Sequence, residues 1–359
     1  MRLALELAGR ALGTTAPNPA VGCVIVKGGH VIARAATAPG GRPHAEAQAL
    51  ATAGSAAVGA TAYVSLEPCA HHGKTPPCAE ALVAARVGRV VVGVGDPDPR
   101  VAGRGIAKLE AAGIAVRQGV LEAEARALNA GFFKCVEKGV PWVTLKVATS
   151  LDGRIAAHTG ASRWITSEAA RAFGHLMRAR HDALMVGSNT VLNDDPDLTC
   201  RLPGLEDRSP LRIIADGRLR VPLTARVVKD AGKVPTWVLT RSDADEARSK
   251  ALETCGAALI RVAPGEDGLV DMREGLRALA RNGVTRLMVE GGAHVAGALL
   301  RAGLIDRLAW FRGNVVIGGD GTPVFTALGV DRPDEATRWH HKSHRRFGDD
   351  VLDIYETAP

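Results

Sequence analysis

The chain has 359 residues, of which 46% are hydrophobic and 4% aromatic, and it carries a formal net charge of +7. This length exceeds what one hydrophobic core usually serves, so two domains are expected. Scarce aromatic rings argue against a nucleic-acid surface built on base stacking, and the arginines are spread along the chain rather than gathered in one run. We expect an α/β protein that binds a phosphorylated small molecule, with no nucleic-acid and no membrane partner.

The cysteines and the N-terminal segment bear on the compartment. Six cysteines are too dilute for a disulfide scaffold in a chain of this length, which favours a reducing cytoplasm. The first ten residues superficially resemble a signal peptide, but Glu6 and Arg10 interrupt the apolar core that such a peptide needs. They predict an amphipathic helix, and no later segment is long and apolar enough to span a bilayer. A cytoplasmic protein is therefore expected.

The first part of the chain alternates between helical and strand periodicity. Helices are expected at 2–12, 44–53, 78–85, 104–112 and 122–138, and strands at 21–26, 31–34, 62–66, 89–94 and 114–118. This rhythm predicts a mostly parallel sheet flanked by helices. Gly139 and Pro141 break the last helix, so we place the domain boundary there, between residues 1–139 and residues 140–359.

The second part repeats the α/β pattern. Strands are expected near 142–148, 183–187, 211–215, 235–239, 258–261, 286–290 and 307–317, and helices near 167–180, 271–281 and 293–302. The segment 349–355 predicts a closing edge strand. The basic run 340–346 could bind phosphate, although a solvated turn or hairpin end is the favoured interpretation.

The sequence pattern most indicative of a chemical function is formed by His44, Cys69 and Cys78. One imidazole and two thiolates make a three-ligand zinc site whose fourth position is left for water, as catalysis requires. Zinc lowers the pKa of such a water toward neutrality. Glu46, two residues beyond the histidine, is placed to carry a proton to a departing amine, which is the arrangement of zinc deaminases. The alternative is a closed structural site, for which His71 or His72 could supply the fourth ligand.

The segment between the two cysteines is longer than in the generic deaminase signature. It continues Glu67-Pro68-Cys69 as Ala-His-His-Gly-Lys-Thr-Pro-Pro-Cys, and it occurs with the runs 17–26 and 95–99. These motifs cover most of residues 13–105 and resemble the deaminase domain of the bifunctional deaminase-reductases of riboflavin biosynthesis. The resemblance implies a cytidine-deaminase-like three-layer αβα domain with one zinc ion.

The same resemblance assigns four residues to the substrate. Asn18, His71, Lys74 and Asp96 would contact the pyrimidine, its ribosyl group or its phosphate. Without it, Asn18 is equally well a turn residue between two prolines, and Asp96 equally well caps a loop. A cation at Lys74, on a glycine-containing loop beside the metal, suits a phosphorylated ligand.

The second half lacks the G-x-G-x-x-G fingerprint that follows a strand in standard dinucleotide-binding sites. The best phosphate-loop candidate is 287–294, where a buried strand meets two glycines and then a helix. Glycines let the backbone approach a ligand, and a helix N-terminus attracts pyrophosphate. By itself, however, a glycine pair is more often a tight turn.

The runs 146–154, 162–167 and 187–198 are similar to the reductase half of the same family, so the resemblance extends to about residue 300. It implies a dihydrofolate-reductase-like α/β domain with NADPH as hydride donor. It assigns cofactor contacts to Ala148, Trp164, Thr190, Asp194, Gly292, Ala293, His294, Val295, Ala296, Gly297 and Ala298. It assigns substrate contacts to Ser162, Arg178, Leu198, Arg201 and Glu290.

These assignments have ordinary structural alternatives. An arginine can hold phosphate through two parallel hydrogen bonds, but its commoner place is a solvated helix face. Trp164 by itself is more often a core residue than a cofactor platform. Lys146, Asp194 and Glu290 are candidates for the proton donor during sugar reduction, and we favour Lys146 and Asp194 as catalytic residues.

The leading hypothesis is a two-step enzyme of riboflavin biosynthesis. It would deaminate 2,5-diamino-6-(5-phosphoribosylamino)pyrimidin-4(3H)-one, releasing ammonia, and then use NADPH to reduce the ribosyl group, giving 5-amino-6-(5-phosphoribitylamino)uracil. One alternative is a nucleic-acid deaminase of the tRNA type with a C-terminal binding module, and another is a structural-zinc interaction protein. The resemblance also makes a homo-oligomer through the reductase domain plausible.

Overall fold

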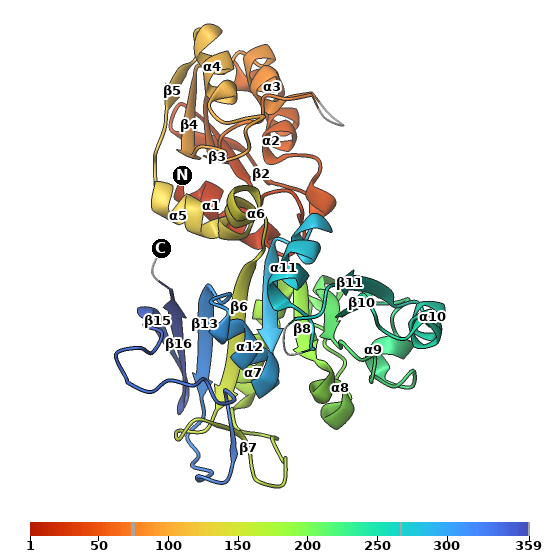
Figure 1. Ribbon diagram of the computed structural model, residues 1–359. Helices are drawn as coiled ribbons and strands as arrows, with labels where there is room; N and C mark the ends of the chain where they lie inside the picture. The colour runs from red at the N-terminus through yellow and green to blue at the C-terminus, as the bar shows by residue number, and fades with distance from the viewer. Residues whose placement is uncertain (73–75, 266–267, 358–359) are drawn as a thin grey trace. The chain divides into compact units, whose positions relative to one another are not determined.

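The computed structural model describes residues 1–72, 76–265 and 268–357. The chain folds as two compact units, Met1–Gly139 and Val140–Pro359, each with its own hydrophobic core (Figure 1). Within the described residues, no helix has the length and apolar character needed to cross a membrane.

The first unit is built on a five-stranded sheet of order β2-β1-β3-β4-β5. Its strands are β1 (Gly22–Lys27), β2 (His30–Ala36), β3 (Thr61–Leu66), β4 (Arg89–Val94) and β5 (Ala115–Arg117). Its α-helices are α1 (Arg2–Ala11), α2 (Ala45–Ala53), α3 (Cys78–Ala84), α4 (Arg104–Ala111), α5 (Glu122–Leu128) and α6 (Ala130–Lys138), and short 3-10 turns occupy Pro39–Gly41 and Gly54–Ala57.

The expectation of a mostly parallel sheet is wrong for this unit. Strand β1 runs antiparallel to both β2 and β3, while β3-β4 and β4-β5 are parallel. For the β1-β2 pair the reason is the tight turn between the strands, where Gly28 and Gly29 have φ of 57° and 80°. Two consecutive residues with positive φ favour a two-residue hairpin, which can join only antiparallel strands.

Helices cover both faces of this sheet. Helix α1 lies so close to β1 that a Cβ on Gly22 would come within 1.9 Å of the Ala4 carbonyl oxygen. The next residue, Cys23, points to the opposite face because side chains alternate along a strand. There it belongs to the same core cluster as Ala45 and Ala49 of α2. The unit is therefore a three-layer αβα sandwich.

The helix expected at 122–138 is two helices. Asn129 separates α5 from α6, and its buried amide exchanges two hydrogen bonds of 2.9 Å with the backbone of Ala20. An asparagine side chain readily competes for backbone partners, so this long-range contact interrupts the helix at Asn129.

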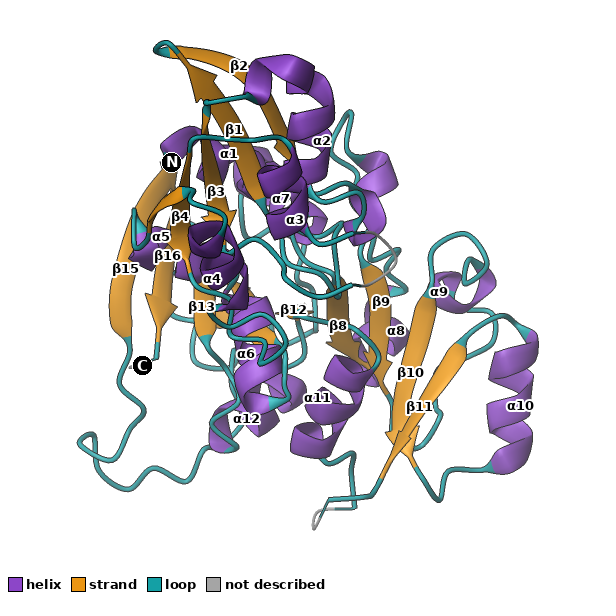
Figure 2. Ribbon diagram, turned by 90° about the horizontal axis from the view of Figure 1, so that it is seen from above, coloured by secondary structure: helices purple, strands orange, loops and turns teal. Residues whose placement is uncertain are grey.

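The second unit contains a nine-stranded sheet of order β11-β10-β9-β8-β12-β6-β13-β16-β15 (Figure 2). Its strands are β6 (Trp142–Thr149), β8 (Ala183–Gly187), β9 (Leu211–Ala215), β10 (Thr236–Arg241), β11 (Ala258–Val262), β12 (Arg286–Glu290), β13 (Arg307–Arg312), β15 (His340–Phe347) and β16 (Asp350–Glu356), and a separate small sheet pairs β7 (Arg154–Ala156) with β14 (Thr322–Pro323). Its helices are α7 (Glu168–Ala179), α8 (Ser188–Asp194), α9 (Arg226–Lys229), α10 (Glu246–Thr254), α11 (Met272–Arg281) and α12 (Ala293–Arg301), with a 3-10 turn at Glu206–Arg208.

The centre of the nine-stranded sheet positions the chemistry of this unit. Strands β8, β12, β6 and β13 are parallel neighbours, so their carboxyl ends meet at one edge. The register of β12 against β6 places Glu290 directly beside Lys146 at that edge. Ligands of open α/β sheets bind outside the carboxyl ends of the strands, so this is where a site is expected.

Three expectations near the C-terminus need correction. The strand expected at 307–317 ends at Arg312, because Gly313 packs so tightly on Ile165 that a Cβ would lie 1.9 Å from its carbonyl oxygen. The basic run 340–346, expected as a solvated turn or hairpin end, is indeed exposed, but it forms β15, a strand of a hairpin. Strand β16 consequently lies between β13 and β15 and is not the edge strand.

Candidate active sites

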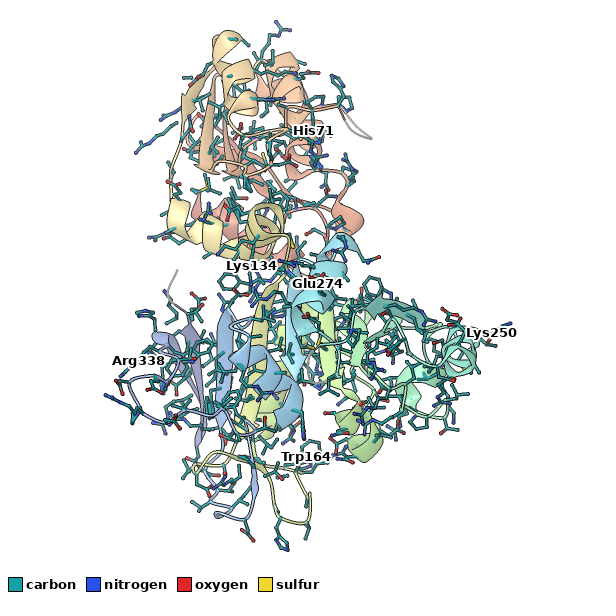
Figure 3. The ribbon with its side chains drawn as sticks, in the orientation of Figure 1. His71, Lys134, Trp164, Lys250, Glu274 and Arg338 are labelled. Atoms are coloured by element: carbon teal, nitrogen blue, oxygen red, sulfur yellow. The ribbon has the colours of Figure 1, made fainter. Side chains whose placement is uncertain are left out.

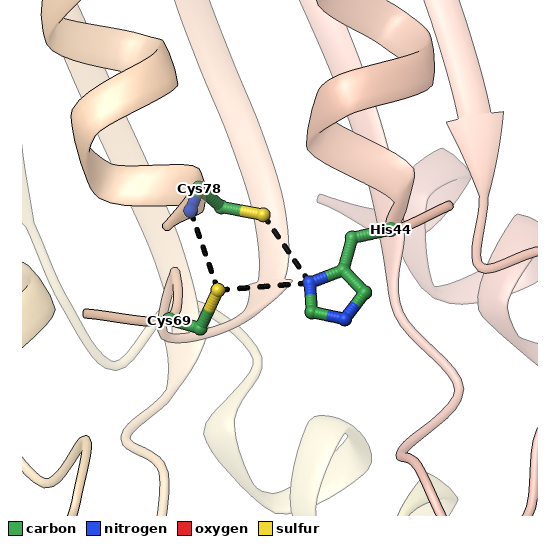
Figure 4. Close-up of side chains that lie close together, drawn as sticks. All are labelled: His44, Cys69 and Cys78. Atoms are coloured by element: carbon green, nitrogen blue, oxygen red, sulfur yellow. Dashed lines mark hydrogen bonds between the residues drawn. The ribbon is translucent and has the colours of Figure 1, made fainter. Parts of the chain in front are cut away.

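The three candidate zinc ligands converge although they come from three different segments (Figure 4). His44 is the N-cap of α2, Cys78 is the first residue of α3, and Cys69 lies on the loop that follows β3. Helices α2 and α3 contact each other, and both begin beside the loop that follows β3. The fold therefore brings together ligands that the sequence separates by as many as 34 residues.

The geometry fits zinc. The Nδ1 atom of His44 lies 3.3 Å from Sγ of Cys78 and 3.6 Å from Sγ of Cys69. Around a tetrahedral zinc ion, an imidazole nitrogen and a thiolate sulfur lie about 3.5 Å apart. In the described part of the chain this group contains no fourth His, Cys, Asp or Glu. His72 instead pairs with Glu80, which argues against a closed structural site.

The surroundings of Cys69 favour the thiolate that a metal requires. Hydrogen bonds from the Cys78 thiol and from His44 lower the pKa of Cys69 to about 4 although burial opposes them. The backbone N–H of Cys78 also donates to Sγ of Cys69 at 3.3 Å. These contacts favour the thiolate form of Cys69, and metal binding requires the second thiol to lose its proton as well.

Glu46 is buried, with 3% of its surface exposed, and it lines the same cavity as His44 and Cys69. Burial, and secondarily the negative charge of Cys69, raises the pKa of Glu46 to about 7. A carboxyl group with a pKa near neutrality can both accept and return a proton, which suits a general acid and base. The cavity measures about 90 Å³.

The substrate residues expected in this unit fall into two groups. Asn18, His71 and Asp96 line the cavity beside the ligands, whereas Lys74 lies outside the described residues. His71, labelled in Figure 3, follows Cys69 on the loop after β3, and within the described residues its buried Nδ1 has no hydrogen-bond partner. Such an atom needs a partner, and a bound substrate can supply it.

Several cavity residues were not singled out from the sequence. Arg42 and Arg100 bring positive charge to the lining, and Phe132 of α6 brings an aromatic ring. Arg42 lies two residues before His44, so its proximity to the site could have been inferred. Nothing in the local sequence marks Phe132, which is brought in only by the fold.

Glu67 is the most informative of the residues that sequence reasoning passed over. Its buried carboxylate accepts backbone N–H groups from Asp96 at 3.2 Å, Gly103 at 3.1 Å, Gly105 at 3.0 Å and Ile106 at 3.3 Å. Glu67 thereby ties the loop that carries Asp96 to the strand that leads to Cys69. This links the position of a cavity residue to the metal site.

We expect Glu67→Gln to lower kcat/KM for deamination about tenfold or more, chiefly by raising KM. The amide cannot accept all four N–H groups, and a lost hydrogen bond to a charged group costs about 1.5–3 kcal/mol. Steady-state kinetics with a zinc assay check this, with Glu110→Gln on the exposed face of α4 as control. An unchanged KM in a zinc-loaded, folded variant would refute the positioning role.

The second unit has a larger cavity, of about 720 Å³, at the carboxyl ends of its central strands. The structure places most of the expected reductase residues on its wall. They are Lys146, Ala148, Ser162, Trp164, Arg178, Thr190, Asp194, Leu198, Arg201, Glu290, Gly292, Ala293, His294 and Ala296.

Three residues of the expected cofactor loop do not line this cavity. Val295 packs against Gly187, where a Cβ would come within 2.9 Å of its side chain. Gly297 lies against Thr326, whose hydroxyl would be 2.4 Å from a Cβ at position 297. Ala298 is likewise absent from the lining. In this structure, Val295 and Gly297 serve the packing of α12.

Arg178 and Glu290 form a two-pronged ion pair beside Lys146. The guanidinium Nε and Nη2 donate to the two carboxylate oxygens at 2.7 Å each, and Nη1 donates to the Thr199 carbonyl at 2.8 Å. The side chains are only 15% and 13% exposed. Arg178 is therefore not on a solvated helix face.

Burial and charge together shift the pKa values of Glu290 and Lys146. Burial alone would raise the pKa of Glu290, but the charge and hydrogen bonds of Arg178 outweigh it and lower that pKa to about 2. Burial lowers the pKa of Lys146, with Arg178 adding to the effect and Glu290 opposing it. A lysine with a lowered pKa releases its proton more readily than a solvated one.

Gly291 and Gly292 form a turn on the wall of this cavity, where their backbone is not covered by side chains of their own. Gly291 and Gly292 have φ of 76° and 84°, a region that residues with a Cβ rarely adopt. Each would place a Cβ 3.5 Å from the Thr190 hydroxyl. Gly292 is also the N-cap of α12, so the first turn of this helix, whose N–H groups have no partner within the helix, lies at the cavity wall.

Trp164 is not a core residue: 65% of its surface is exposed (Figure 3). The Arg171 guanidinium lies 4.2 Å from the centre of its ring, and that of Arg163 lies 5.7 Å away. Arg171, Arg163 and Arg226 all line the cavity and were not singled out from the sequence. They add positive charge where phosphorylated ligands are expected.

Family comparisons cover both units. Residues 1–94 match the cytidine and deoxycytidylate deaminase zinc-binding region, and residues 141–352 match the RibD C-terminal domain. Riboflavin biosynthesis protein RibD of Escherichia coli is 42% identical over 363 residues, covering 98% of this chain and 96% of its own. The Bacillus amyloliquefaciens protein of the same name is 45% identical over 323 residues, covering 90% of this chain and 86% of its own.

Solved structures of related proteins resemble this chain over its whole length. Acinetobacter baumannii RibD superposes with a TM-score of 0.90 at 38% identity, covering 100% of this chain and 98% of that one. A Thermotoga maritima diaminohydroxyphosphoribosylaminopyrimidine deaminase/5-amino-6-(5-phosphoribosylamino)uracil reductase gives 0.86 at 34% identity, covering 100% and 97%.

These matches confirm the expected fold class and decide between the functional hypotheses. The nucleic-acid alternative required a binding module in the second half, where the chain instead matches a reductase domain. The structural-zinc alternative leaves that match unexplained. The chain belongs to the RibD family and is a bifunctional enzyme of riboflavin biosynthesis, with a zinc-dependent deaminase domain followed by an NADPH-dependent reductase domain.

Proposed function

We propose that His44, Cys69 and Cys78 hold the zinc ion and that Glu46 is the acid and base of deamination. The observation that carries this proposal is the convergence of the three ligand atoms beside a buried carboxyl group in one cavity. Zinc supplies a Lewis acid that makes water nucleophilic near neutral pH. Glu46 takes the proton of the attacking water and returns it to the departing amino group, which leaves as ammonia.

We propose that the substrate is 2,5-diamino-6-(5-phosphoribosylamino)pyrimidin-4(3H)-one, the compound expected from the resemblance. Asn18, His71 and Asp96 are offered as the groups that orient its pyrimidine, because they line the cavity beside Glu46. Lys74 and Arg42 are the cations proposed for its phosphate. Polar groups that fix orientation in a small cavity hold the reacting carbon against the nucleophile.

In the second unit, we propose that NADPH and the deaminated product share the larger cavity. NADPH supplies the hydride that reduces the ribosyl group to a ribityl chain. Lys146 gives the accompanying proton, since it lies half-buried beside Glu290 on the cavity wall and its pKa is lowered. Asp194 ends α8 on the wall of the same cavity, and we propose it as a cofactor contact and as the second candidate for this proton.

We base the remaining proposed contacts with cofactor and substrate on the residues that line this cavity. Ala148, Trp164, Thr190 and the turn at Gly292–His294 contact the cofactor, and Ser162, Leu198 and Arg201 contact the substrate. Arg178 and Glu290 act as a pair, in which the arginine keeps the carboxylate charged and oriented. Arg201 is the cation proposed for the substrate phosphate, because its side chain is half exposed.

A coupled assay tests this function. The zinc-loaded enzyme should release ammonia from the diaminopyrimidine and oxidise NADPH only afterwards. Removal of zinc with a chelator should abolish ammonia release, yet NADPH oxidation on previously deaminated substrate should continue at the original rate. Ammonia release by the metal-free protein would overturn the zinc assignment, and loss of both activities would argue against independent sites.

We also propose the cytoplasm as the compartment, because a site of two thiolates requires thiols that stay reduced. A homo-oligomer formed through the reductase unit is proposed as well. Its support is β15, which forms an edge of the nine-stranded sheet and leaves backbone groups available for pairing.

A further inference from the structure

Three side chains converge on the outer hairpin of the second unit, outside the cavities described above. Nε2 of His341 and Nδ1 of His344 each lie 3.0 Å from the same oxygen, Oδ1 of Asp353. The three ligand atoms lie within 4.8 Å of one another. Both histidines belong to β15 and the aspartate to β16 (Figure 1), so the group bridges two neighbouring strands.

A bulge in β15 makes this convergence possible. In a regular strand, residues three apart point to opposite faces of the sheet. Here His341 pairs with Tyr355 and Ser343 with Ile354, so Lys342 is an extra residue without a partner in the ladder. The extra residue turns His341 to the face of His344 and Asp353. The T-shaped contact of His341 with Tyr355, at 5.2 Å, agrees with this placement.

The Asp353 carboxylate is fixed in place by burial and by a hydrogen bond, as metal-binding carboxylates commonly are. The side chain of Asp353 is only 7% exposed, and its second oxygen accepts a hydrogen bond of 2.6 Å from Nη2 of Arg312. Metal-ligating carboxylates are commonly oriented in this way by an outer partner. The histidines are 48% and 49% exposed, so solvent and ions reach the other side of the group.

We propose that His341, His344 and Asp353 form a second divalent metal site, distinct from the deaminase zinc. Two imidazoles and one carboxylate suit zinc and neighbouring transition metals. Ligand atoms about 2.0–2.1 Å from such an ion lie about 2.9–3.5 Å apart, and the two N···O distances of 3.0 Å fall in that range. Water fills the open positions, and the ion links β15 to β16.

The two sites differ in ligand chemistry, which makes them separable. The deaminase site has two sulfur ligands and the hairpin site has none. Imidazoles on an exposed strand, with the positive charge of Arg312 near the shared carboxylate, bind a cation more weakly than two thiolates do. The hairpin site should therefore fill second, after the first equivalent of metal has entered the deaminase site.

Metal counting by native mass spectrometry on the full-length enzyme dialysed against zinc tests the proposal. Two equivalents per chain are expected in the wild type and one in His341→Ala and in His344→Ala. His340→Ala is the matched control, because His340 is exposed on the same strand but outside the group, and it should keep two.

Cobalt substitution identifies where each equivalent is bound. The first equivalent should give the intense sulfur-to-metal charge-transfer band of a thiolate site, and the second only weak visible bands that both alanine variants lose. A single equivalent in the wild type, or a second one that survives in either alanine variant or disappears in His340→Ala, would overturn the proposal. Ammonia release should be normal in all three variants, so failure here leaves the deaminase assignment untouched.

Discussion

Glu46→Gln is expected to slow ammonia release by about 10²–10⁴-fold, the range that a general acid or base contributes. The amide has nearly the same shape as the carboxylate, so the small cavity and the ligands should be undisturbed. It cannot take the proton of the attacking water, however, and so cannot return one to the amine. The measurement is ammonia release by the zinc-loaded variant with the diaminopyrimidine substrate.

Two further measurements on Glu46→Gln distinguish loss of the catalytic step from loss of the folded structure. The variant should still bind one zinc in the deaminase site and should oxidise NADPH normally when given deaminated substrate. Glu124→Gln, an exposed change on α5, is the control and should keep full activity. Normal ammonia release by Glu46→Gln would remove Glu46 from the mechanism, and an equal loss of both activities would contradict independent sites.

Glu290→Gln is expected to lower the free energy of unfolding of the second unit by about 3 kcal/mol and to reduce reductase activity strongly. Removing one partner of a buried ion pair leaves the other charge uncompensated, which typically costs about 3–5 kcal/mol. All five tryptophans lie in residues 140–359, so tryptophan fluorescence during urea unfolding reports on this unit.

The control for this change is Glu246→Gln. Glu246 also pairs with an arginine, at 2.9 Å from Arg261, but its side chain is 82% exposed. Exposed pairs contribute about 0–1 kcal/mol, so this variant should unfold almost like the wild type. Equal unfolding free energies for Glu290→Gln and the wild type would show that the Arg178 pair does not stabilise the unit.

The stability difference should also depend on pH. The pKa of Glu290 is about 2 in the folded protein, whereas an unpaired glutamate has a pKa of about 4.3. Because the folded pKa is the lower one, the contribution is fully present above about pH 4.3 and is lost as pH falls toward about 2. Urea unfolding at pH 7 and pH 3 should show a smaller gap between wild type and Glu290→Gln at pH 3. An equal gap would mean that ionisation of Glu290 is not its source.

Short motifs explain what could be predicted from the sequence. The positions and residue types of His44, Cys69 and Cys78 indicated a zinc site because few chemistries need one imidazole and two thiolates in that order. Most helices and strands were recognisable because burial imposes a period of 3.6 or 2 on the side chains of an element that packs on one face. The missed elements β7, β14, α8 and α9 are too short to show a period. The exposed helix α10 has no strong apolar face, and the exposed strand β15 has no alternation of apolar and polar residues.

The features that could not be predicted from local sequence depend on contacts between residues far apart in the chain. The antiparallel pairing of β1 was within reach of the sequence through Gly28 and Gly29, but the break at Asn129 depends on Ala20, which is 109 residues away. The four backbone N–H groups that bind Glu67 likewise cannot be recognised from the sequence, because every residue except proline has an N–H.

The clearest contrast is between Arg178 and the hairpin histidines. The sequence by itself determined that both were candidates for binding charged groups. Only the register of β12 against β6 and the packing of α7 turned Arg178 into the buried partner of Glu290, and only a bulge in β15 brought His341 and His344 to one carboxylate. Residue types and their local periods are properties of a short stretch of chain, whereas charge pairs and ligand sets depend on distances between stretches, which exist only after folding.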